Sequence, residues 1–155
     1  MLTTPLRKSA RHPSIDYAQA GRAFSVTIAT RNRVPFFLDL GFGSHCVDLL
    51  RRVCDSTQTK CFAYCLMPDH VHLLLGLGDF SLSSVVGSWK SLCYQARNAI
   101  EPGEVLWQRS FFDRAVRKQD DLRQAAEYVL NNPVRAGLVA DFRAYPLCGS
   151  FEFLL

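Results

Sequence analysis

The 155-residue sequence contains no apolar run long enough to cross a membrane, no internal repeat and no low-complexity segment. Its first eight residues carry charge, but no apolar core follows them, so we expect no secretory signal peptide. None of its six cysteines forms a C-x-x-C pair, and most lie among apolar neighbours. Reduced thiols in the core are therefore expected, with disulfides the alternative for an even number. These absences favour a cytoplasmic protein that does not bind membranes.

Charge of one sign is only slightly in excess: 18 Lys and Arg oppose 14 Asp and Glu, for a formal net charge of +4. So mild an excess is weak evidence for a polyanionic partner, and the positions of the basic residues matter more than their sum. A chain of this length most simply forms one domain. Residues 1–21 are polar, with Pro5, Pro13 and Gly21, and predict a basic N-terminal arm. The single domain is then expected over residues 22–155.

Hydrophobic periodicity defines the expected elements. Periods of 2 and 3.6 residues predict strands at 23–30, 61–67, 70–77 and 105–112, and helices at 44–55, from Ser81 to residue 100, and at 120–131. The order β-α-β-β-α-β followed by one more helix is ferredoxin-like, an antiparallel sheet with two helices on one face. We expect this α+β fold, with the additional C-terminal helix near the other face.

The third expected strand begins with His70-Val71-His72. Side chains alternate along a strand, so His70 and His72 share one face while Val71 points to the other. Two imidazoles side by side can bind one divalent metal ion. The alternative is an unliganded pair of surface histidines.

The last expected helix carries a tyrosine away from its buried stripe. At 100° per residue, Tyr128 lies about 120° from the centre of that stripe, and Asn132 about 80° away on the same side. The two are one turn apart and face together. Spacing alone favours the simpler interpretation, a flanking tyrosine with Asn132 as a helix-ending cap before Pro133.

Three ordered blocks resemble a known family: residues 67–74 (MPDHVHLL), 107–113 (WQRSFFD) and 128–139 (YVLNNPVRAGLV). They are similar to the REP-associated tyrosine transposases, part of the IS200-like, single-tyrosine HUH transposase superfamily. Residues 27–33 (TIATRNR) and 88–91 (SWKS) match as well, so the resemblance covers about residues 22–146. The chain departs from the family at Arg114, where many relatives have histidine, and in residues 145–150, which lack a tryptophan.

The resemblance implies a metal-dependent chemistry on DNA. It makes His70 and His72 ligands of Mg²⁺ or Mn²⁺, Asn132 the third ligand, and Tyr128 the nucleophile. The imidazoles by themselves would equally suit zinc. The implied function is a single-stranded DNA endonuclease and strand transferase that acts on REP-type hairpins through a 5′-phosphotyrosine intermediate. The alternatives are a domesticated hairpin-binding module without turnover, and a metal-dependent hydrolase that uses His70 and His72.

Basic and aromatic residues near the blocks are candidates for DNA contacts. The residues expected to bind DNA are Arg31, Arg33, Lys90, Arg109, Arg114 and Arg135. Trp89 lies on a buried stripe and is expected in the core, whereas Phe111 or Phe112 could stack on a base. The expected partner is single-stranded DNA with hairpin elements, bound by a monomer or, alternatively, a homodimer.

Overall fold

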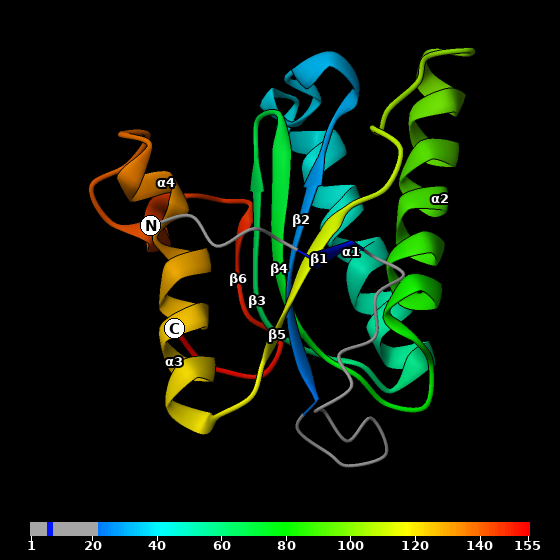
Figure 1. The fold of residues 1–155 in the computed structure, drawn as a ribbon. Coiled ribbons are helices and arrows are strands. Elements are labelled where there is room, and N and C mark those ends of the chain that lie inside the picture. Colours follow the sequence, from blue (N-terminus) through cyan, green and yellow to red (C-terminus); the bar gives the residue numbers. More distant parts are fainter. Residues whose placement is uncertain (1–5, 8–21) are drawn as a thin grey trace.

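The computed structural model describes Leu6–Arg7 and residues 22–155 and contains one six-stranded antiparallel sheet (Figure 1). The strands are β1 (Leu6–Arg7), β2 (Ala23–Ala29), β3 (Lys60–Met67), β4 (His70–Gly76), β5 (Phe112–Val116) and β6 (Cys148–Gly149). Their order is β1-β5-β2-β4-β3-β6. The four inner strands with the helices that connect them have the ferredoxin-like arrangement, which confirms the predicted fold class. Edge strands β1 and β6 were not predicted, and most of the expected N-terminal arm lies outside the described residues.

Two long helices cover one face of the sheet, α1 (Leu40–Thr57) and α2 (Leu82–Ile100). We call this side the closed face. Val26 and Ile28 of β2, Val71 and Leu73 of β4, and Trp89 of α2 are completely buried there, as expected for Trp89. Burial of this apolar surface is the main source of stability for the domain. In the described part of the chain no helix is long and apolar enough to cross a membrane.

Both long helices begin at a capping side chain. The hydroxyl of Ser81 accepts a hydrogen bond from the Ser84 amide, where the sequence predicted the start of α2. Helix α1 begins earlier than predicted because the carboxylate of Asp39 accepts from the Phe42 amide. The sequence pattern missed this first turn because it contains two glycines, Gly41 and Gly43, in place of an apolar stripe.

The strand predicted at residues 105–112 is wrong, because pairing in β5 begins only at Phe112. Thr30 forms an isolated bridge with Trp107, whereas Thr27 pairs with Phe112. The β5 side therefore has two more residues than β2 over this interval. The extra length is absorbed at Ser110, whose φ of 75° is left-handed. Phe111 then enters the core, and Phe112 emerges on the opposite face.

That opposite face is covered mainly by α3 (Gln119–Leu130), and the short helix α4 (Asn132–Arg135) that follows also contacts β3. We call it the α3 face. Ala126, Val129 and Leu130 pack on Cys65 and Leu74 of the sheet. The additional helix thus lies where it was predicted. Pro133 does not itself end α3. The chain turns at Asn131, and Pro133 lies in the first turn of α4. Short 3-10 helices at Arg31–Arg33, Phe36–Leu38 and Phe142–Ala144 complete the fold.

Candidate active site between β4 and α3

His70, His72 and Tyr128 lie together on the α3 face. The two imidazole rings are perpendicular, with centroids 4.9 Å apart. The ring of Tyr128 meets His72 edge-on at a centroid distance of 6.4 Å. Tyr128 is 53% exposed, although its ring contacts His72. The packing of α3 on β3 and β4 brings these residues together although they are far apart in the sequence.

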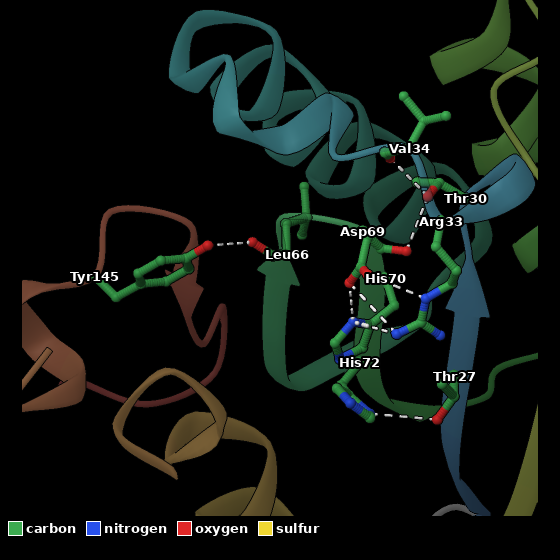
Figure 2. Close-up of polar contacts among 9 residues, drawn as sticks. All are labelled: Thr27, Thr30, Arg33, Val34, Leu66, Asp69, His70, His72 and Tyr145. Atoms are coloured by element: carbon green, nitrogen blue, oxygen red, sulfur yellow. Dashed lines mark hydrogen bonds and ion pairs between the residues drawn. The ribbon is translucent and has the colours of Figure 1, made fainter. Parts of the chain in front are cut away.

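The imidazole of His70 is oriented by a charged pair that sequence reasoning missed. Its Nδ1 donates to Asp69 Oδ1 over 2.7 Å, and Arg33 Nε donates to Asp69 Oδ2 over 3.1 Å (Figure 2). Burial by itself would raise the pKa of Asp69, but the hydrogen bonds from His70 and Arg33 outweigh it and hold that pKa below its usual value. With Nδ1 bound to a carboxylate, Nε2 of His70 is the nitrogen available to a metal.

His72 has the corresponding arrangement with a neutral partner. Its Nδ1 lies 3.3 Å from the hydroxyl of Thr27 on the adjacent strand (Figure 2). Burial lowers the pKa of His72 to about 4, and the positive charges of His70, Arg135 and Arg33 act in the same direction. The ring is therefore neutral at pH 7, which is the form that binds a metal.

The third expected ligand, Asn132, begins α4 one turn beyond Tyr128. Its amide nitrogen donates to the backbone carbonyls of Val129, at 3.2 Å, and Tyr128, at 3.4 Å. The amide oxygen is thus the atom left for a cation. No group of three His, Cys, Asp or Glu suited to a metal occurs in the described residues. In their chemistry, two imidazole nitrogens and an amide oxygen would suit a divalent ion with open positions for substrate, and the approach of Asn132 to the two histidines stays a prediction.

Arg135, expected to bind DNA, contacts the tyrosine, and its binding to DNA stays a prediction. Its guanidinium carbon lies 3.8 Å from the centroid of the Tyr128 ring, and its Nη2 donates to the Tyr128 carbonyl over 2.7 Å. The planar guanidinium covers one face of the ring while also binding the backbone of the same residue. The pair limits how the tyrosine ring can rotate.

The other predicted DNA contacts lie in different settings. Arg31 and Arg109 are exposed, and Arg33 is held by Asp69. Lys90 donates to the carbonyls of Gln108 and Ser110, at 3.1 and 3.0 Å, and so stabilises the segment before β5. Arg114 is exposed on β5. Contact of these residues with phosphate stays a prediction.

Asp113 is a second residue whose unusual environment the sequence did not indicate. Its carboxylate points to the closed face, is 1% exposed, and has no hydrogen-bond partner on either oxygen among the described residues. Burial raises its pKa to about 6. Asp113 lies just beyond the strand expected at residues 105–112 and precedes Arg114, so the sequence pattern did not indicate its burial.

Comparisons with known proteins agree with this geometry. Residues 22–132 match the family model described as "Transposase IS200 like". A Haemophilus influenzae protein provisionally named REP-associated tyrosine transposase is 26% identical over 145 residues, or 84% of this chain and 80% of that protein. The REP-associated tyrosine transposase of Escherichia coli K12 is 30% identical over 86 residues, or 54% and 50% of the two chains. In fold, the chain resembles a REP-associated tyrosine transposase solved bound to a REP hairpin, with a TM-score of 0.72, 24% identity, and coverage of 89% of this chain and 82% of that one.

Proposed function

The chain belongs to the IS200-like transposase family, whose members cleave and join DNA, and from this premise we propose that it cuts and rejoins single-stranded DNA beside REP-type hairpins. Tyr128 is the proposed nucleophile. The observation that carries the proposal is the group of three rings, in which Tyr128 lies 6.4 Å from His72 and His72 lies 4.9 Å from His70. A hydrolase that used only the two histidines would give this tyrosine no role.

The proposed step is a transesterification at phosphorus. The phenol oxygen of Tyr128 attacks the scissile phosphate, the bond from phosphorus to the 3′ oxygen breaks, and the proton lost by the phenol is balanced by one gained at the 3′ oxygen. The products are a 5′-phosphotyrosine and a free 3′-hydroxyl. Because a phosphodiester replaces a phosphodiester, a second 3′-hydroxyl can reverse the step and join two strands without ATP.

The residues around the tyrosine assist this step in two ways. Arg135 restrains the ring of Tyr128, so less orientational freedom has to be lost at attack. His70, His72 and Asn132 would hold Mg²⁺ or Mn²⁺, with Asp69 and Thr27 fixing the two imidazoles. When bound, such an ion supplies Lewis-acid polarisation of the phosphate and neutralises charge at the leaving oxygen.

The proposed partner is a DNA hairpin with a single-stranded flank, bound by a monomer. The relative solved with a REP hairpin supports it. Two exposed arginines, Arg31 and Arg109, follow the bridged residues Thr30 and Trp107 and supply positive charge for phosphate contacts. A tyrosine that must attack in line also requires a flexible, unpaired phosphate beside a structured element.

The test follows the two ends of the cut strand. A flanked hairpin labelled at its 3′ end should yield a labelled protein adduct on a denaturing gel with Mg²⁺ or Mn²⁺, whereas a 5′ label should appear on a shorter free strand. Tyr128→Phe should give no adduct but bind the hairpin normally. Tyr94→Phe, at a half-exposed tyrosine of α2, is the matched control and should behave as wild type.

Three other outcomes would contradict the proposal. An adduct that persists in Tyr128→Phe would assign the nucleophile to another residue. Hairpin binding without adduct in any metal would indicate a domesticated binding module. Cleavage in zinc without adduct would indicate a hydrolase that uses His70 and His72.

A further inference from the structure

Phe112 occupies an unusual position on the α3 face. Its ring is 51% exposed, whereas that of its neighbour Phe111 is 4% exposed in the core. Phe112 belongs to neither of the two hydrophobic clusters formed by the described residues. Packing in these clusters therefore explains Phe111 but does not explain the exposed ring of Phe112, whose paired neighbours on the sheet are Thr27 and Arg7.

The strand register places this ring in line with the candidate active site. Thr27 pairs with His72 on one side and with Phe112 on the other. Directly paired residues share a face, so the three side chains form one row across the sheet. Since adjacent strands are about 4.8 Å apart, Phe112 lies about 10 Å from His72.

The next row along β2 adds a positive charge. Ser25 pairs with Leu74 on one side and with Arg114 on the other. Arg114 is exposed on β5. Ser25 and Thr27 of β2, the strand between β5 and β4, are half-buried. We call these four residues, Ser25, Thr27, Phe112 and Arg114, the β2–β5 strip. It combines an exposed aromatic ring, a guanidinium and two small hydroxyl side chains, beside the part of the face that α3 covers.

We propose that the β2–β5 strip is a subsite for one unpaired nucleotide, with its base stacked on Phe112 and its phosphate near Arg114. Every base has a π face, so an exposed aromatic ring beside a cation binds single strands through stacking. A stacked strand advances about 3.4 Å per nucleotide and an extended one further, so 10 Å corresponds to at most about three nucleotides. The ring of Tyr128 lies a further 6.4 Å from that of His72, so the base lies within about five nucleotides of the phosphate that Tyr128 attacks. This inference rests on the proposed function and names part of its substrate site.

The experiment measures equilibrium binding in a Tyr128→Phe background, where no cleavage competes. A hairpin with a single-stranded flank is titrated with abasic sites placed at successive flank positions. One position should weaken binding on the order of tenfold with Phe112 intact. In Phe112→Leu the unmodified DNA should bind on the order of tenfold more weakly, and the abasic site should have no further effect. Phe112→Trp should restore both the affinity and the sensitivity to that position.

The controls separate a lost subsite from other failures. Phe80→Leu, at an exposed phenylalanine after the far end of β4, should bind as the parent protein does. Wild-type affinity in Phe112→Leu, or an abasic effect that is unchanged in this variant, would overturn the subsite. If the subsite fails while Tyr128 still forms an adduct, the proposed function stands. If no hairpin binds the Phe112-containing protein at any position, the proposed function fails as well.

Discussion

Neighbouring residues of β4 face two different environments. Val71 and Leu73 are 0% exposed against α1 and α2, whereas His70 and His72 lie half-buried on the side of α3. One strand thus supplies the core with alternate residues and the candidate active site with the residues between them. On this side α3 brings in the tyrosine and leaves the side chains of Tyr128 and Phe112 about half exposed.

The difference between the two faces of β4 is tested most strongly by substitutions at the neighbouring residues His72 and Leu73. Leu73→Ala should lower the free energy of unfolding by about 2–5 kcal/mol, because it leaves a cavity in the closed face. His72→Ala should cost about 1 kcal/mol, because it removes one weak hydrogen bond to Thr27, yet it should abolish adduct formation. Urea denaturation of both variants gives the two values. Equal losses of stability would mean that His72 is a core residue.

The closed face also buries a carboxylate side chain, that of Asp113. Because burial raises its pKa from 3.8 to about 6, the folded protein retains a proton that the unfolded chain loses between these pH values. The free energy of unfolding should therefore fall as pH rises from about 4 to 6 and stay lower above that range. Asp113→Asn should remove this part of the pH dependence and stabilise the protein at pH 8 by about 2–3 kcal/mol.

Urea titrations of the Asp113→Asn variant across pH 4–8 measure this effect. Asp79→Asn, at an exposed aspartate, is the control and should leave the curve unchanged. Destabilisation by Asp113→Asn at pH 8 would show that the carboxylate has a favourable partner in the folded protein.

On the α3 face, the Asp69 carboxylate should control metal affinity. Asp69→Ala removes the acceptor that fixes His70 and should weaken Mn²⁺ binding about 10- to 100-fold with little change in melting temperature. Calorimetric titration with Mn²⁺ in the absence of DNA measures this. Asp55→Ala, at an exposed aspartate of α1, should bind Mn²⁺ as wild type does. Unchanged affinity in Asp69→Ala would exclude His70 as a ligand.

Substitutions at the two exposed arginines, Arg135 and Arg109, should have different effects, one on the reaction rate and the other on DNA binding. Arg135→Lys keeps the charge but loses the planar contact with Tyr128, so the rate of adduct formation should fall about tenfold at unchanged hairpin affinity. Arg109→Gln should instead weaken binding and reduce the log–log salt slope by about 0.7, at an unchanged rate with saturating DNA. The reverse result would make Arg135 the phosphate contact.

Periodicity predicted the faces of the sheet because alternation along β2 and β4 directly reflects burial. The start of β5 was not predictable in this way. Its position depends on Ser110 and on the contact of Lys90 with two backbone carbonyls, and both arise from tertiary structure. The motif blocks indicated Tyr128 and the two histidines. Asp69 and Thr27 were missed because their roles follow from side-chain geometry and from strand register, which the sequence does not contain.

The most direct measurement is to identify the residue that carries the DNA. The adduct formed on a flanked hairpin is digested with trypsin and nuclease, and the modified peptide is sequenced by mass spectrometry. The peptide of residues 124–135 contains Tyr128 as its only tyrosine and should carry the nucleotide on that side chain. A nucleotide found on any of the other four tyrosines, or on a residue that is not tyrosine, would contradict the account.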